Sequence, residues 1–339
     1  MMPEKRYFSG MLGGCAVGDA LGFCIEGSPR KVCLDYIEEV LLPRRYELIE
    51  CEPYGFGQYS DDTQLTRELL SSYVERKGFD PQHFAGRIRR LFEEERCVGW
   101  GGATSRSAQR LIDGVPWDEA GEPPPAAGCG SAMRSGGVGL ISFDDTEELL
   151  KVATTQSVIT HRDVRAQAGS VCVAFAVGFV LVEKSFSRGE LIDAALEPVE
   201  KVDTGFAHSL FKLKQYVAVE PEKALPLIAT EGGGAVEGEG LSPFVVPTVL
   251  WALYSFLRSP DNYLETIHTS LGCGGDVDST AAMAGAISGA YLGEECLPED
   301  VTERLTDQGE WEWQDLRELS YRVWHVKKEL GGGRSKDDA

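Results

Sequence analysis

The stretch RYFSGMLGGCAVGDALG, from Arg6 to Gly22, decides the fold. Its apolar residues have helical periodicity, and small residues recur at positions 10, 13, 14, 16, 18 and 20. A helix with so few large side chains lets another backbone come close to it. We therefore expect this helix to lie at the centre of the protein.

Helical periodicity continues along most of the chain. In the segment 62–74, leucine and tyrosine side chains at 65, 69, 70 and 73 share one face, and Pro81 suits the first turn of the next helix. Further helices are predicted over 81–95, 104–112, 131–141, 145–157, 162–183, 188–197, 203–218, 220–229, 244–258, 260–270, 278–292, 298–307 and 312–330. The segment 162–183 is apolar on nearly every face and is predicted to be buried. No convincing run of alternating strand residues occurs, so the predicted fold class is all-α.

Composition limits the class of protein. The chain has 339 residues, of which 42% are hydrophobic, and a formal net charge of −21. This charge repels phosphate, which argues against nucleic-acid or anionic-membrane partners but not against one phosphorylated ligand in a local pocket. The most apolar stretch, 171–182, is about half as long as a membrane span. Nine cysteines without a CxxC pair, and a start without a signal peptide, favour a reducing cytoplasm.

The length alone would allow about two domains. The two conspicuous loops, 121–125 and 231–243, do not separate segments of different composition. We therefore predict a single domain over residues 1–330, followed by a disordered tail over 331–339.

Two acidic motifs lie far apart in the sequence: YSDDT at 59–63 and GGDVDST at 274–280. Each places carboxylates and hydroxyls at the start of an apolar helix, where capping is the more common role for either motif alone. Together the motifs offer four carboxylates and two hydroxyls. That is the oxygen-only ligand set that Mg²⁺ or Mn²⁺ prefers.

Electrostatic repulsion supports the metal hypothesis. Two carboxylates about 4 Å apart repel by roughly 4 kcal/mol at an effective dielectric constant of about 20. Clustered carboxylates therefore need cations or shifted pKa values. This argument holds only if the two motifs meet in space, which their spacing does not show.

Three other segments are candidates for a site. Glu26 lies in an expected loop, where a glutamate is usually solvated but can act as an acid or base, whereas Asp19 is expected to be structural. The glycine-rich segment GCGSAMR at 128–134 precedes a helix and can expose amides to a phosphate, although such loops are frequent. His161 is more commonly a structural histidine than a ligand.

In this order, the segments resemble the ADP-ribosylglycohydrolase family. The matching pieces are GGCAVGDALG with Glu26, YSDDT, GCGSAMR, SVITH, VPTVLWAL and GGDVDSTAAMAGAISGAYLG, which span about residues 10 to 293. The resemblance implies a compact, orthogonal multi-helix domain with two Mg²⁺ or Mn²⁺ ions between its helices. It also implies a hydrolase that removes ADP-ribose from a modified acceptor by cleaving the bond at ribose C1″.

The resemblance assigns roles to individual residues. It implies that the metal ligands are Ser60, Asp61, Asp62, Asp276, Asp278 and Ser279. It implies catalytic roles for Glu26, Asp61 and Asp278, with Glu26 ranked first for proton transfer. The substrate-binding residues, beside the diphosphate and the distal ribose, would be Gly128, Cys129, Gly130, Ser131, Met133 and His161.

The sequence departs from the family pattern at four positions. Ser60 and Ser279 stand where threonine is frequent, and both keep the hydroxyl. Cys129 stands where asparagine is usual, which puts one polar substrate contact in doubt. Val277 replaces a commonly polar residue and should point away from the metals.

Two alternatives stay open at this stage. One is a non-catalytic ADP-ribose-binding or structural protein, because the family includes a lens crystallin. The other is a hydrolase of a free ADP-ribosyl metabolite or a modified nucleic acid. We expect a cytoplasmic monomer that acts on an ADP-ribosylated protein or a small ADP-ribosyl compound, with no membrane partner, and the acceptor stays undetermined.

Overall fold

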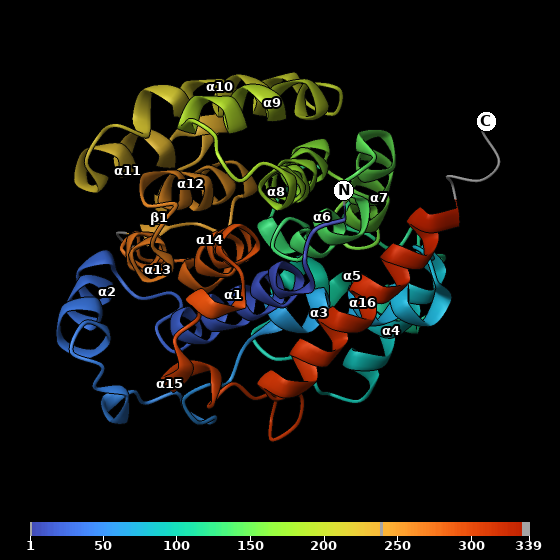
Figure 1. Cartoon of the computed structure of the whole chain (residues 1–339), viewed down its shortest axis with the longest axis horizontal. Helices are drawn as coiled ribbons and strands as arrows, with labels where there is room; N and C mark the ends of the chain where they lie inside the picture. Colours follow the sequence, from blue (N-terminus) through green and yellow to red (C-terminus); the bar gives the residue numbers. More distant parts are fainter. Residues whose placement is uncertain (1, 238–239, 334–339) are drawn as a thin grey trace.

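The computed structural model describes residues 2–237 and 240–333, and almost all of its regular structure is helical (Figure 1). The helices are α1 (Lys5–Phe23), α2 (Arg30–Tyr36), α3 (Asp61–Arg76), α4 (Pro81–Glu93), α5 (Gly102–Ile112), α6 (Gly136–Ser142), α7 (Thr146–Val158), α8 (Val164–Val182), α9 (Arg188–Glu200), α10 (Thr204–Tyr216), α11 (Pro221–Ala229), α12 (Val245–Arg258), α13 (Tyr263–Leu271), α14 (Val277–Leu292), α15 (Glu299–Thr302) and α16 (Trp313–Gly333). The described strands, β1 (Val236–Glu237) and β2 (Gly240–Leu241), form one short antiparallel pair. The all-α prediction is confirmed.

Helices α1 and α14 pack lengthwise against each other at the centre of the protein (Figure 1). Their backbones come unusually close. A Cβ atom built on Gly14 would lie 2.2 Å from the carbonyl oxygen of Gly285, and one built on Gly10 would lie 2.3 Å from that of Gly289. Because residues four apart share one helical face, these glycines form a flat stripe along α1. The central position predicted for this helix is confirmed.

The other helices surround this pair. Helix α8 contacts α6, α7, α9, α12 and α14, while α16 crosses α1 and α3 (Figure 1). By length and composition α8 could cross a membrane, with a mean hydropathy of 1.7, but 72% of its most apolar window is buried inside the protein. Its burial follows from its nearly uniform apolar surface, as predicted. One continuous cluster of buried apolar side chains extends from Phe8 to Val326.

Several predicted boundaries differ from the structure. The predicted helix 298–307 is helical only over Glu299–Thr302. The backbone of Thr306 instead pairs with a distant segment: its N–H donates to the Gly57 carbonyl oxygen, and its own carbonyl oxygen accepts from the N–H of Tyr59. This long-range pairing overrides the local helical pattern.

Three further differences concern short elements and the C-terminal end. The sequence reading missed α2 and the π-helical turn Ile37–Leu41 that continues it, both too short to show a clear period. The predicted helix 131–141 divides into a 3₁₀ turn, Cys129–Ser131, and the helix α6. Helix α16 extends to Gly333, so the predicted tail begins inside a helix, and its remaining residues, 334–339, lie outside the described part of the chain.

The close contact between α1 and α14 leads to a stability prediction. We expect Gly14→Ala to lower the free energy of unfolding by about 1–3 kcal/mol, because the added methyl group must push two backbones apart. Urea denaturation measures this change.

Gly86→Ala is the matched control. Gly86 lies inside α4, and a Cβ atom built on it meets nothing within 4 Å. This variant should gain about 0.5–1 kcal/mol from the better helix propensity of alanine. An equal gain for Gly14→Ala would show that the α1–α14 contact tolerates a larger spacing.

Candidate functional site

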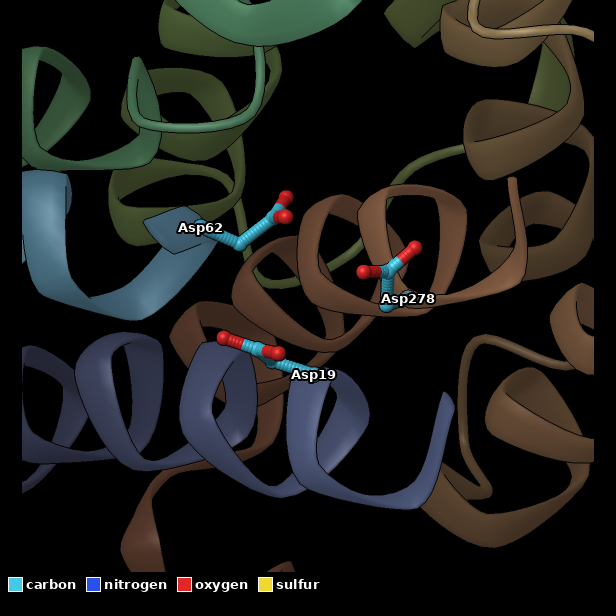
Figure 2. Close-up of side chains that lie close together, drawn as sticks. All are labelled: Asp19, Asp62 and Asp278. Atoms are coloured by element: carbon cyan, nitrogen blue, oxygen red, sulfur yellow. The ribbon is translucent and has the colours of Figure 1, made fainter. Parts of the chain in front are cut away.

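The two acidic motifs meet where α3 and α14 begin, beside the C-terminal half of α1. Figure 2 shows Asp19 of α1, Asp62 of α3 and Asp278 of α14 with their carboxylates turned toward a common space. One oxygen of each lies within 4.8 Å of the others, and Glu26, Asp276 and Asp278 form a second such group. The motifs touch directly, because the Ser279 hydroxyl donates to Asp62 Oδ2 over 3.3 Å. The two acidic motifs therefore meet in space, so their carboxylates repel one another and need cations or shifted pKa values.

Asp19 holds the start of α3 in place. Its Oδ1 accepts a hydrogen bond from the N–H of Ser60 at 2.9 Å. Its Oδ2 accepts from the N–H of Thr63 at 3.0 Å and from the Thr63 hydroxyl at 2.6 Å. These bonds satisfy amides that a helix start leaves free. The structural role expected for Asp19 is confirmed.

Two other carboxylates of the cluster each keep one oxygen that has no protein donor among the described residues. Asp62 Oδ1 and Asp278 Oδ1 are buried and have no hydrogen-bond partner in the described part of the chain. Their residues are only 1% and 2% exposed. A buried carboxylate oxygen without a partner is costly, and it is also the ligand atom that a hard divalent cation takes. The residues present therefore fit a metal centre.

Burial and mutual repulsion favour protonated carboxyls in the metal-free cluster. Burial, followed by the charges of neighbouring carboxylates, raises the pKa of Asp61, Asp62 and Asp278 well above its ordinary value. The same causes raise the pKa of Glu26 to about 7, with Asp276 and Asp19 as the charged neighbours. Protein surrounds Glu26 on most sides, yet its side chain is open to solvent. It can therefore exchange protons with solvent more readily than the buried aspartates.

A cavity of about 260 Å³ opens over this cluster. Most residues that the sequence assigned to the site line it. They are Glu26, Asp61, Asp62, Gly128, Cys129, Gly130, Met133, His161, Asp276, Asp278 and Ser279.

Two assigned residues lie behind the cavity wall. Ser60 is fully buried and caps α3, and its hydroxyl donates to Asp62 Oδ2 over 3.1 Å, so it still touches the cluster. Ser131 does not line the cavity. Its hydroxyl accepts hydrogen bonds from Ser157 at 2.8 Å and Ser170 at 3.1 Å, inside the helical packing. Neighbouring helices thus use the hydroxyl of Ser131, and its role in substrate binding stays a prediction.

Cys129 contacts the second acidic motif. Its thiol donates to Asp276 Oδ2 over 3.1 Å and lies 3.7 Å from the Ser279 hydroxyl oxygen. Burial and the charge of Asp276 raise the pKa of this thiol well above its ordinary value, so it stays protonated. The side chain that replaces the usual asparagine thus bonds to the protein itself.

The sequence reading missed one wall of the cavity. Residues 99–104, together with Pro243, line it. Helix α5 begins here at Gly102 without a side-chain cap, and Trp100 stands half-exposed before it. The signal in the sequence was the run Gly-Trp-Gly-Gly at 99–102 before a predicted helix.

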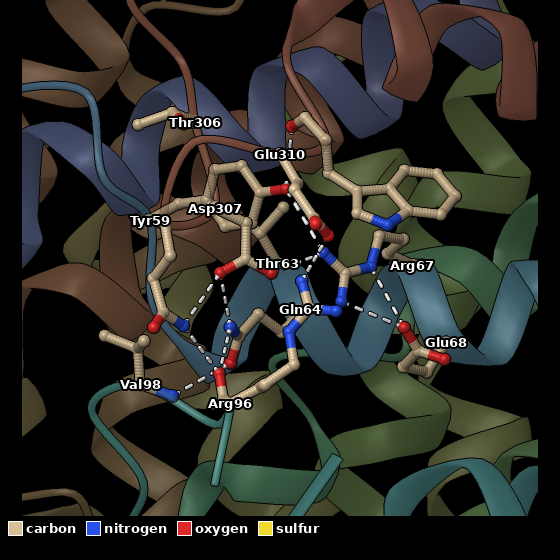
Figure 3. Close-up of polar contacts among 12 residues, drawn as sticks. Tyr59, Thr63, Gln64, Arg67, Glu68, Arg96, Val98, Thr306, Asp307 and Glu310 are labelled. Atoms are coloured by element: carbon tan, nitrogen blue, oxygen red, sulfur yellow. Dashed lines mark hydrogen bonds and ion pairs between the residues drawn. The ribbon is translucent and has the colours of Figure 1, made fainter. Parts of the chain in front are cut away.

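A buried polar network supports the first acidic motif from behind (Figure 3). The Arg67 guanidinium of α3 donates to Asp307 Oδ2 over 2.6 Å. Gln64 donates to Asp307 Oδ1 over 2.8 Å and accepts from the N–H of Val98 at 3.0 Å. The carbonyl oxygen of Val98 in turn accepts from the N–H of Asp61 at 2.7 Å. The C-terminal loop and the segment before α5 thus both fix the start of α3.

Comparison with known proteins agrees with this geometry. The ADP-ribosylglycohydrolase family model matches residues 2–331. The chain is 30% identical to an uncharacterized protein of Archaeoglobus fulgidus, covering 96% of this chain and 97% of that one. It is 27% identical to ADP-ribosylhydrolase ARH3 of Homo sapiens, with 86% and 87% covered, and 24% identical to ADP-ribosylarginine hydrolase Tri1 of Pseudomonas putida, with 87% and 73% covered.

A solved structure has the same fold. It is named an ADP-ribosylglycohydrolase-related protein complex, and it matches with a TM-score of 0.69 at 23% identity, covering 96% of this chain and all of that one. Because the family model spans nearly the whole chain and the acidic motifs meet at one cavity, this protein belongs to the ADP-ribosylglycohydrolase family and is an ADP-ribosyl hydrolase, an enzyme that cleaves a glycosidic bond.

Proposed function

We propose that this enzyme removes ADP-ribose from a modified protein side chain by metal-dependent cleavage of the bond at ribose C1″. The observation that carries the proposal is the pair of buried, unpartnered carboxylate oxygens of Asp62 and Asp278, which belong to two motifs facing one cavity. The proposed cofactors are two Mg²⁺ or Mn²⁺ ions. Their proposed ligands are Ser60, Asp61, Asp62, Asp276, Asp278 and Ser279.

The chemistry is that of glycoside hydrolysis, whose transition state resembles an oxocarbenium ion. When bound, the ions supply positive charge that offsets the carboxylates and makes a nearby water more acidic. Glu26, with a pKa of about 7, can accept or donate a proton near neutral pH at the edge of the cavity. We rank it first for proton transfer, ahead of Asp61 and Asp278.

The rest of the cavity suits the ADP-ribosyl group. The backbone at Gly128 and Gly130, together with the uncapped start of α5, offers amides to a diphosphate. Trp100 is 49% exposed, and its indole offers an aromatic surface to adenine. These features allow an anionic ligand to bind to a protein whose overall charge repels it.

Activity measurements test the proposed reaction. We expect ADP-ribose to be released from an ADP-ribosylated protein in the presence of Mg²⁺ or Mn²⁺, and the release to stop in EDTA. Asp62→Asn should abolish the reaction, and Glu26→Gln should lower kcat by about 10²-fold or more. Asp118→Asn, which changes an exposed loop carboxylate, should leave kcat unchanged.

A comparison of substrates identifies the acceptor to which ADP-ribose is attached. Arginine-linked, serine-linked and free ADP-ribosyl substrates should be compared in the same assay. Release from the free compounds alone would replace the protein acceptor with a metabolite. Full activity after exhaustive chelation would exclude the metal centre.

The raised pKa values predict how metal ions and pH act together on stability. The folded, metal-free cluster binds protons more tightly than the unfolded chain does. Its contribution to stability is therefore complete below the unfolded pKa values near 4, and it is lost as pH rises through the folded values, which are about 6 for Asp19 and about 7 for Glu26. The melting temperature in EDTA should fall from about pH 5.5 to about pH 8.

Added Mg²⁺ should raise the melting temperature more at about pH 8 than at about pH 5.5, because protons compete with the metal for the carboxylates. Asp62→Asn serves as the comparison, since it removes one ligand and should reduce the Mg²⁺ effect at both pH values. A Mg²⁺ effect that is equal at the two pH values would contradict this linkage.

Ligand binding can be measured without turnover. ADP-ribose should stabilise the Mg²⁺-loaded protein by about 2.7 kcal/mol when it is present at about a hundred times its Kd. AMP lacks the distal ribose and should stabilise less, and the difference should shrink when the metal is removed. Equal shifts from the two ligands, with or without metal, would mean that the distal ribose does not lie at the acidic cluster.

A further inference from the structure

The Thr160 hydroxyl lies between two nitrogen atoms beside the cavity. It is completely buried, with Arg134 Nη2 at 2.8 Å and His161 Nδ1 at 2.9 Å. Its backbone is fixed as well, because the Thr160 carbonyl oxygen accepts from the Ser107 hydroxyl and from the N–H of Glu122, both at 2.9 Å. The hydroxyl therefore has a fixed position relative to both neighbours.

The direction of these hydrogen bonds follows from what each group can donate. A guanidinium has donors and no acceptor, so Arg134 donates to the Thr160 oxygen. Within the described part of the chain, the other group in hydrogen-bond range of this hydroxyl is His161 Nδ1. If Nδ1 carried a hydrogen, the buried Thr160 O–H would have no acceptor, which is costly. The threonine therefore donates to Nδ1, and the ring hydrogen sits on Nε2.

Arg134 is held firmly enough to impose this direction. It is 0% exposed, and its other acceptors are uncharged oxygens: Gln156 Oε1 at 2.6 Å, the Gln156 carbonyl at 2.9 Å and the Gly130 carbonyl at 3.2 Å. Burial lowers the pKa of Arg134 to about 9, against the opposing effect of Asp61, so it remains a cation at neutral pH.

The Nε2 edge of His161 faces the glycine-rich wall of the cavity. A Cβ atom built on Gly128 would lie 3.3 Å from Nε2, and one built on Gly130 would lie 2.8 Å from Cε1. Side chains at these two positions would therefore close off this edge, and all three residues line the cavity although His161 is only 2% exposed. Burial, and next the charge of Arg134, lower the pKa of His161 to about 3. Arg106 acts in the same direction, while Glu122 and Asp163 oppose it.

We propose that Arg134 and Thr160 are positioning residues that fix His161 as the neutral tautomer with its hydrogen on Nε2, so that the ring donates a hydrogen bond to an anionic oxygen of the ligand. A cation at this place would bind any phosphate strongly through its charge, whereas a neutral donor in a fixed direction selects an oxygen at one position. The ligand rests on the proposed function, but the tautomer does not.

Nitrogen NMR of the full chain with ¹⁵N-labelled histidine tests the tautomer directly. His161→Gln identifies the signals of this ring among the five histidines. We expect a protonated Nε2 and an unprotonated Nδ1 in the ligand-free enzyme, unchanged between about pH 5.5 and about pH 8. Thr160→Ser keeps the hydroxyl and should keep this pattern, whereas Thr160→Val should give a mixture of tautomers.

Binding of ADP-ribose, measured by calorimetry with Mg²⁺ present, supplies the second readout. Thr160→Val should weaken binding about tenfold, the loss expected for one hydrogen bond to a charged group, and Thr160→Ser should restore most of it. Circular dichroism checks that both variants are folded.

The outcomes separate this proposal from the proposed function. A hydrogen on Nδ1, or an imidazolium, in the wild-type enzyme overturns the proposal whatever the variants do. An unchanged tautomer in folded Thr160→Val also overturns it, because the threonine would then not set the ring. If the ring has the expected tautomer but the enzyme does not bind ADP-ribose, Arg134 and Thr160 still fix His161 as proposed, whereas the proposed function is overturned.

Discussion

The close contact between the backbones of α1 and α14 is the constraint on which the site depends. It continues to the end of the helix pair, where a Cβ atom built on Gly22 would lie 2.6 Å from the Asp278 Cα. The same spacing brings Asp19 within reach of both α3 and α14. Larger residues in place of the α1 glycines would separate the helices that carry the carboxylates. The geometry of the site therefore depends directly on the packing of α1 against α14.

The site also needs a compensation for its charge. Buried carboxylates face one another across α1, α3 and α14. Arg134, a buried arginine whose charge acts on Asp61, is engaged with uncharged oxygens. In the described part of the chain, the charge of these carboxylates is therefore left to protons or bound cations to balance, because no basic side chain forms an ion pair with them. By contrast, the charges of Arg67 and Asp307 neutralise each other in a buried ion pair. This network holds α3 in place, and the first turn of α3 faces the cavity.

Much of this arrangement could be predicted from the sequence, because its signals are local. Helical periods, the small residues of α1 and the two acidic motifs each occupy a continuous stretch. The features that were missed depend on contacts between distant segments. Thr306 pairs with the segment before α3, and the hydroxyl of Ser131 is used by α7 and α8. The segment before Trp100 is joined to α3 by the bonds of Val98 to Asp61 and Gln64. The hydrophobic periodicity of a local stretch gives no sign of hydrogen bonds to distant segments.

The bond between Asp307 and Arg67 has a consequence for the order of synthesis. On the ribosome, residues 61 and 62 emerge long before residues 276 and 278, and Asp307 follows later still. Until then the Arg67 guanidinium has no aspartate to pair with, and the start of α3 lacks its support from the C-terminal loop. A chain that stops before residue 276 therefore carries only the first acidic motif, and one that stops before residue 307 lacks the aspartate that helps to hold α3 in place.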